Sequence, residues 1–172
     1  MRGVVIALMM MAGAAMAQDD GMPAFDPSLL ETCLDNASLR AEQGEERDAE
    51  SCIGLAAGQC MKEEGGDTTA GMVQCQSRET GFWDARLNDA YAAAMAQAEE
   101  MDRINAKADP SAPKQAAALK QMQRDWIAFR DSSCAYERSL WGSGSGAAVA
   151  LAGCALSITA EQALRLERYR ER

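Results

Sequence analysis

The sequence predicts an all-α fold, an antiparallel helical hairpin with shorter helices stapled to it by disulfides. Residues 68–108 and 114–137 carry apolar residues three and four positions apart, the spacing that places side chains on one face of a helix. No stretch alternates apolar and polar residues as a strand does. Six cysteines, an even number, favour a chain held together by disulfides. We see no internal repeat and no second globular domain.

Residues 1–17 have the features of a secretory signal peptide. Arg2 gives a positive start, Val4–Ala15 is a short apolar run, and small residues precede a cut after Ala17. The run is too short to span a membrane, and no later segment reads as apolar for long enough. We therefore expect cleavage after Ala17, a soluble periplasmic or secreted product, and no stable membrane insertion.

Composition excludes several classes of function. The chain has 17 basic and 26 acidic residues, a net charge of −9, which disfavours nucleic acid and anionic membranes and favours basic partners. It has no histidine, so Ser–His–Asp and Cys–His catalysis are excluded. An enzyme would have to use two carboxylates, and no pair stands out among so many acids. We expect no enzyme, no catalytic residue and no cofactor.

The cysteines are expected to form disulfides and not a metal site. Without histidine and without a CxxC pair, the chain lacks the usual ligands of structural zinc. Glycine-rich turns lie inside two of the intervals between cysteines, which lets the chain double back there. Each disulfide would contribute roughly 2–4 kcal/mol. The predicted pairs are Cys134 with Cys154, Cys60 with Cys75, and by remainder Cys33 with Cys52.

The N-terminal third is expected to contain a leader at 18–27 and two short helices. Ser28–Arg40 has a helical apolar face, with Ser28 as the cap. Ala41–Glu50 is rich in acidic residues, which is typical of a solvated surface. Ser51–Met61 reads as a short helix between cysteines. We divide the exported chain into this N-terminal segment, 18–59, and a helical domain, 60–172.

Two long helices follow. The first is expected to start at a cap on Thr68 or Thr69 and to end at 109–113, with Gly81 as a bend or a close packing point. The second covers Lys114–Glu137. Residues 141–146, with alternating glycine and serine, read as a flexible connection. Thr159 and Gln162 have the spacing of a capping box, which predicts a separate final helix.

Each long helix carries a motif with aromatic and polar members. The aromatic and leucine positions fall on one helical face, so we expect core packing, with a sugar-stacking platform as the alternative. Arg130 is expected to bind Asp84 or Asn88 across the hairpin; a ligand or partner contact is the alternative. The motifs are Trp83-Asp84-x-x-Leu87-Asn88-x-x-Tyr91 and Trp126-x-x-Phe129-Arg130-Asp131-x-x-Cys134.

Together with Cys75 and Cys154, these motifs resemble the LprI-like domain, a lysozyme-inhibitor-related family, over about residues 60–169. Gln74 stands where the family commonly has Asn, and Gln162 where an Arg is usual. Residues 18–59 lie outside the shared pattern. The resemblance implies an exported bacterial helical protein with paired cysteines, and the family name implies inhibition of lysozyme.

A binding protein is therefore the leading hypothesis, with lysozyme or another basic envelope protein as partner. Lysozymes are commonly basic and hold their carboxylate pair in an open cleft, which an exposed loop can enter. The candidate contact residues are Trp141, Gly142 and Ser143, an aromatic anchor beside small residues. The competing hypothesis is a structural or stress-related envelope protein with a ligand other than lysozyme.

Overall fold

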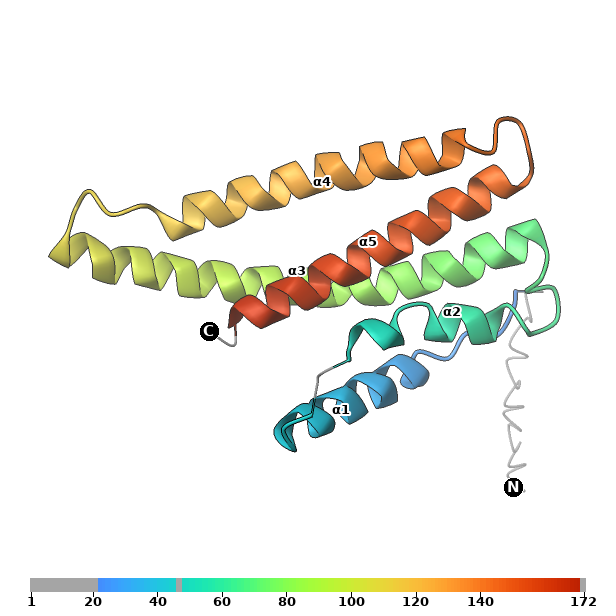
Figure 1. The fold of residues 1–172 in the computed structure, drawn as a ribbon, viewed down its shortest axis with the longest axis horizontal. Coiled ribbons are helices and arrows are strands. Elements are labelled where there is room, and N and C mark those ends of the chain that lie inside the picture. The colour runs from blue at the N-terminus through green and yellow to red at the C-terminus, as the bar shows by residue number, and fades with distance from the viewer. Residues whose placement is uncertain (1–21, 46–47, 171–172) are drawn as a thin grey trace, which may run out of the picture.

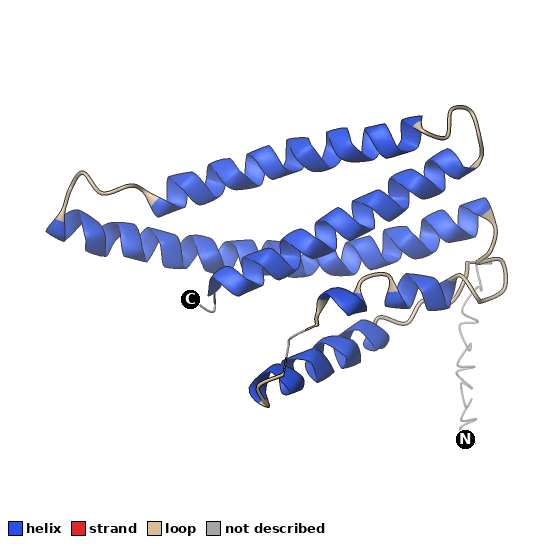
Figure 2. Ribbon diagram, in the orientation of Figure 1, coloured by secondary structure: helices blue, strands red, loops and turns tan. Residues whose placement is uncertain are grey.

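The computed structural model of the chain describes residues 22–45 and 48–170, without the side chain of Arg170. The predicted leader at 1–17 lies outside the described residues. Every regular element in the described part is helical, which confirms the all-α prediction (Figure 2). In chain order the elements are α1 (Ser28–Glu42), the 3-10 helix η1 (Glu50–Cys52), α2 (Leu55–Cys60), α3 (Thr69–Ala108), α4 (Gln115–Ser139) and α5 (Gly146–Arg170).

The long helices form the predicted hairpin with a third long helix added to it. α3 and α4 are antiparallel, and α5 runs back along both of them (Figure 1). In the same view α1 and α2 lie on the side of α3 away from α4. α3 thus packs against α4 and α5 on one side and against α2 on the other, while α1 packs against η1 and α2.

α3 is organised around one buried stripe. Thr68 caps it as predicted, because its hydroxyl accepts a hydrogen bond from the Gly71 N–H at 2.9 Å. Trp83 and Leu87 are buried, and small alanines continue the stripe and let the facing helices approach closely. A Cβ at Gly81 would meet nothing within 4 Å, so the expectation of close packing there is wrong. The buried members of the stripe are Gly71, Cys75, Glu79, Trp83, Leu87, Ala90, Ala94 and Ala98.

The turn between α3 and α4 is fixed by two aspartates. Asp109 follows the last residue of α3, and its carboxylate accepts hydrogen bonds from the hydroxyl and N–H of Ser111. These bonds lower the pKa of Asp109 below its ordinary value. Asp102 reaches from α3 to the start of α4, where it accepts from the N–H groups of Gln115 and Ala116 at 2.7 and 3.1 Å. One arm of the hairpin thus caps the other.

α5 differs from the sequence prediction. It is a single helix from Gly146 to Arg170, so the expectation of a separate final helix capped by Thr159 is wrong. Thr159 and Gln162 lie inside it and are buried. Gln162 donates to the side chain of Gln123 on α4 at 3.0 Å instead of capping a helix. Residues 154–170 contain no glycine or proline that would break the helix near Thr159.

From the sequence, no segment after the leader is expected to be long and apolar enough to span a membrane. By length and composition, α5 meets that criterion. Residues 146–169 have a mean hydropathy of 1.5 over an 18-residue window, which is apolar enough for a span. The same length and apolarity suit the central helix of a helical bundle. α5 packs along both α3 and α4, and the interhelical pair Arg86–Glu167, at 2.7 Å, ties it to α3.

The N-terminal elements follow the prediction with two corrections. Ser28 is the first helical residue of α1 and not its cap; its N–H donates to Asp26 at 2.9 Å. The single short helix expected at 51–61 is divided into η1 and α2 by Gly54, whose φ of +86° ends any continuous helix. That left-handed conformation favours glycine.

All six cysteines are paired in the predicted way. The disulfides are Cys33–Cys52, Cys60–Cys75 and Cys134–Cys154. The first joins α1 to η1, the second joins α2 to α3, and the third joins α4 to α5. Disulfides are typical of proteins outside the reducing cytoplasm.

A buried carboxylate holds α2 against α3. Glu79 is fully buried on α3, and its carboxylate accepts from the N–H groups of Gly54 and Ala57 at 2.6 and 2.7 Å. A third bond, at 3.0 Å, comes from the indole N–H of Trp83. The N-terminus of α2 is therefore capped by a side chain from another helix, because Gly54 has no side chain to cap it. The sequence motifs gave no indication of this role.

Candidate functional site

Two separate hollows on the surface of the hairpin are lined by some of the candidate site residues, among them Asp84, Arg130 and Trp141. One is a groove of about 830 Å³ between the first turns of α3, the end of α4 and the start of α5, which we call the aromatic groove. The other is a pocket of about 430 Å³ between the middle of α3, α4 and α5, which we call the polar pocket. They share no lining residue.

The aromatic groove has exposed rings along its α4 side. Phe129 is 60% exposed and Trp141 is 55% exposed, and both line the groove. Between them on the same helical face lie Ser133 and Glu137, since residues four apart on a helix are neighbours. The α3 wall has Thr69, Met72 and Gln76. The α5 wall is mostly apolar or small, with Val149, Ala150, Gly153 and Ile158 among its residues.

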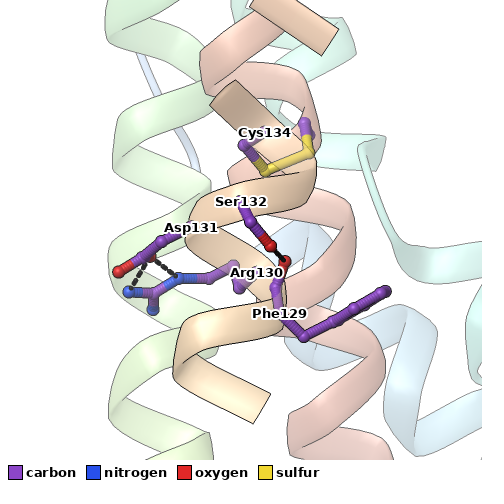
Figure 3. A network of polar contacts seen from close by, with 6 residues as sticks. Phe129, Arg130, Asp131, Ser132 and Cys134 are labelled. Atoms are coloured by element: carbon purple, nitrogen blue, oxygen red, sulfur yellow. Dashed lines mark hydrogen bonds and ion pairs between the residues drawn. A yellow bond between two sulfur atoms is a disulfide. The ribbon is translucent and has the colours of Figure 1, made fainter. Parts of the chain in front are cut away.

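The exposure of Phe129 corrects the prediction of core packing at that position. Figure 3 shows Phe129 on the opposite side of α4 from Arg130 and Asp131. Trp126 and Cys134 of the same motif do face the core, one partly buried and one buried. Phe129 lies at the margin of the apolar stripe of its helix. At such a position, residue spacing alone does not decide whether a side chain faces the core or the solvent.

Trp141 is held in place by the backbone around it. A Cβ built on Gly146 would overlap the Cε3 atom of the Trp141 ring, so the ring lies directly on the first residue of α5. The Trp141 carbonyl accepts from the Gly144 N–H at 2.9 Å, and the Gly144 carbonyl accepts from Ala147 at 3.1 Å. The connection expected to be flexible is thus a run of hydrogen-bonded tight turns, closed by the Cys134–Cys154 disulfide.

The other two predicted contact residues, Gly142 and Ser143, occupy the tip of this connection. Gly142 has a φ of +54°, a left-handed conformation, and a Cβ there would meet nothing within 4 Å. Both residues are exposed, but neither lines the aromatic groove. Of the three candidates, the structure therefore places only Trp141 at the groove.

Charge near the groove differs from the charge singled out in the sequence. Glu137 lines the groove, and the exposed acids Glu63, Glu64 and Asp67 lie in the loop just before α3, whose first residue, Thr69, is also in the lining. The described part of the acidic run at 41–50 follows α1, which lies on the other side of α3 from α4 and the α4–α5 connection (Figure 1). Residues 46–47 of that run are not described.

The polar pocket gathers the charged members of the two motifs. Its lining includes Asp84 from α3 and both Arg130 and Asp131 from α4. Asn88 supports Asp84 by donating to its Oδ2 at 3.1 Å. The remaining walls are Thr80, the Cys134 end of a disulfide, and Leu151, Ala155 and Thr159 of α5.

Arg130 does not make the interhelical bond that the sequence predicts. Its Nε and Nη2 both donate to Oδ1 of its neighbour Asp131, at 3.0 and 2.8 Å (Figure 3). Its guanidinium also lies over the Trp126 ring, 5.1 Å from the centroid. With a carboxylate and a ring available on its own helix, the guanidinium is satisfied without crossing to Asp84 or Asn88.

Replacing Arg130 by alanine should therefore lower the free energy of unfolding by only about 1 kcal/mol. The side chain is 27% exposed and its partner Asp131 is 62% exposed, so solvent screens the pair. Denaturant unfolding of the oxidised protein measures this change, with Arg124→Ala on the same helix as the control. A decrease of more than about 3 kcal/mol in the free energy of unfolding would indicate that Arg130 does hold the helices together.

The described residues contain no group of histidine, cysteine or acidic side chains that would hold a metal ion. Sequence reasoning placed Arg130 near Asp84, and both line the polar pocket, but it missed the apolar α5 wall of the aromatic groove and the bonding of Arg130 to Asp131. The first depends on α5 being one helix. The second depends on the rotation of α4 about its own axis, which spacing does not determine.

Comparison with known proteins gives a family and one relative. A family model described as "Lysozyme inhibitor LprI" matches residues 60–166. A protein of Rhodobacter capsulatus, described as an uncharacterized 17.7 kDa protein in the puhA 5'region, is 30% identical over 136 residues, which cover 78% of this chain and 80% of that protein. No solved structure is significantly similar to the chain. The family match covers the α3 and α4 motifs, the Cys60–Cys75 and Cys134–Cys154 disulfides and most of α5, and the chain belongs to the lysozyme inhibitor LprI family.

Proposed function

We propose that this chain is an exported protein, cleaved after Ala17, that binds lysozyme through the aromatic groove and so inhibits it. The observation that carries the proposal is the pair of exposed rings, Trp141 and Phe129, on one groove of a member of the LprI family. Residues 60–172 would carry the binding, and residues 18–59 would form an N-terminal addition held by disulfides. The proposed role is binding and not catalysis.

The rings suit the role of anchors. Aromatic side chains dominate the affinity of many protein interfaces because they bury a large area and have few rotatable bonds. The Trp141 ring is already placed by its contact with Gly146. A side chain that is ordered before binding loses less conformational entropy when the complex forms.

The charge around the groove suits a basic partner. Glu137 lies between the rings, and the acids at 63, 64 and 67 precede the groove's α3 wall. Such charges raise the rate of encounter with a positively charged protein, and salt weakens the effect because the Debye length is about 8 Å at physiological ionic strength. Apolar anchors act mainly on the rate of dissociation.

Binding of the oxidised mature protein to a chicken-type lysozyme, measured by surface plasmon resonance over a salt series, tests the proposal. We expect association to slow at least severalfold between low and physiological salt, and lysis of cell walls by the same lysozyme to be inhibited. Glu137→Gln should slow association, whereas Glu42→Gln, at the end of α1 on the other side of α3 from α4, should not.

Absence of binding at low salt, where attraction between unlike charges is strongest, would refute the proposal. Binding without protection of the cell wall would indicate charge attraction alone. In either case the alternative, an envelope protein with another basic ligand, would become the better account. A pull-down of the mature protein from envelope extract then identifies that ligand.

A further inference from the structure

We propose that the polar pocket binds a primary alkylammonium group, carried by a lysine side chain or by a free alkyl amine. The proposal is independent of lysozyme binding, because the polar pocket shares no residue with the aromatic groove. It rests on the charges, the free acceptors and the apolar walls that converge in one place.

The net charge of the pocket is negative. Asp131 neutralises Arg130 through the bonds to its Oδ1, and the guanidinium is turned onto Trp126. Asp84 accepts a hydrogen bond from the neutral amide of Asn88, which leaves its negative charge unneutralised. A cation entering the pocket would gain a charged hydrogen bond from Asp84.

The distribution of acceptors favours an ammonium over a guanidinium. Each aspartate has one carboxylate oxygen engaged, Oδ2 of Asp84 by Asn88 and Oδ1 of Asp131 by Arg130. A guanidinium binds best to both oxygens of one carboxylate, whereas the three N–H bonds of an ammonium can go to separate acceptors. One oxygen from each of two aspartates matches the second arrangement.

A buried hydroxyl in the wall of the pocket also lacks a partner. Thr159 is 1% exposed, and its Oγ1 has no hydrogen-bond partner among the described residues. Leaving a buried hydroxyl unpaired is unfavourable, and a donor brought into the pocket would supply the missing bond. Such an atom points to a ligand because packing within the chain does not satisfy it.

The other walls suit an alkyl stem. Leu151 and Ala155 of α5 and the Cβ and sulfur of Cys134 are apolar. A chain of methylene groups can lie on them while its charged end reaches Asp84. The pocket thus combines an apolar wall with an acidic end. These two parts complement the methylene chain and the ammonium group of a lysine side chain.

Titration of the oxidised protein with n-pentylamine at neutral pH, followed by two-dimensional amide NMR, tests the site. We expect saturable shifts at residues around the pocket, such as Thr80, Asp84 and Leu151, with a dissociation constant in roughly the millimolar range. Pentanol, which has the same stem without charge, should give no comparable shifts.

Asp84→Asn should raise the dissociation constant at least about tenfold, since it replaces a charged acceptor by a neutral amide. Asp89→Asn, an exposed aspartate on the same helix that does not line the pocket, is the matched control and should leave it unchanged. Circular dichroism confirms that both variants fold. Equal binding by Asp84→Asn and the parent, or equal binding of pentanol, would overturn the proposal.

A second arm separates the sources of the ammonium. Nα-acetyl-lysine N-methylamide should bind like pentylamine if the pocket accepts a lysine that belongs to a polypeptide. Binding of pentylamine alone would assign the pocket to free amines, and failure of both would refute it. Trp141→Ala should not alter amine binding, so a failure of lysozyme binding and a failure of this site are distinguishable.

Discussion

Replacing Glu79 by alanine should lower the free energy of unfolding by about 4 kcal/mol, the largest effect on stability that we expect from one substitution in this chain. The change would leave two buried donors without an acceptor, the N–H of Ala57 and the indole of Trp83, and one partly buried donor, the N–H of Gly54. Each unpaired buried donor is unfavourable by roughly 1–3 kcal/mol. It would also leave a cavity beneath α2.

Chemical denaturation of the oxidised protein measures this loss. Glu79→Gln should be less severe, because the amide keeps one oxygen to accept from α2 but loses the charge and directs an NH₂ group at another donor. Glu99→Ala, an exposed glutamate on the same helix, should change stability by less than about 0.5 kcal/mol. A Glu79→Ala protein as stable as the Glu99→Ala control would show that α2 does not depend on this carboxylate.

Glu79 also shows what the sequence could and could not predict. The periodic apolar residues of α3 predict its length and its buried face, and Thr68 predicts its start. The sequence alone does not show whether an acidic residue within an apolar stripe is buried or exposed. Its role follows from Gly54, which gives α2 a start without a capping side chain, and from the Cys60–Cys75 disulfide, which ties α2 to α3.

The disulfide pairs were predictable because each closes a short local loop. The exposure of Phe129 and the bonding of Arg130 to Asp131 were not, although their motif was recognisable. Spacing places both near an apolar stripe, but the rotation of α4 is set by its contacts with α3 and α5 and by the Cys134–Cys154 bond. That rotation turns Phe129 to solvent and brings Arg130 and Asp131 to the polar pocket.

The continuity of α5 has the same kind of cause. Thr159 and Gln162 match a capping box by spacing, but a cap forms only where the helix begins, and burial against α3 and α4 favours a helix through the whole apolar stretch. Once α5 is one helix starting at Gly146, the apolar wall of the aromatic groove follows. The candidate contact residue Trp141 could be named from sequence, but its groove could not.

Trp141→Ala should weaken lysozyme binding by about 30-fold or more, mainly through faster dissociation, if the aromatic groove is the contact surface. The salt dependence of the association rate should be the same for this variant as for the parent, because the substitution changes no charge. Leu140→Ala is the matched control: Leu140 is also exposed and adjacent in sequence, but it does not line the groove. Similar losses in both variants would indicate general apolar contact at the connection and not an anchor at Trp141.

Gly146→Ala separates the placement of the ring from its presence. An added Cβ would overlap Cε3 and Cζ3 of Trp141, so the ring must leave its position over α5. Alanine is a better helix former than glycine, so the loss of that contact is partly offset in the folded state. We expect stability within about 1 kcal/mol of the parent and roughly tenfold weaker lysozyme binding.

Gly81→Ala on α3, where a Cβ would meet open space, is the control for a glycine-to-alanine change within a helix. It should leave binding unchanged in the same plasmon-resonance experiment. Unaltered binding by Gly146→Ala together with a loss in Trp141→Ala would mean that the ring acts in more than one orientation. Because the Cys134–Cys154 disulfide holds the ends of the connection in every variant, any difference between them reports on the ring and not on the loop as a whole.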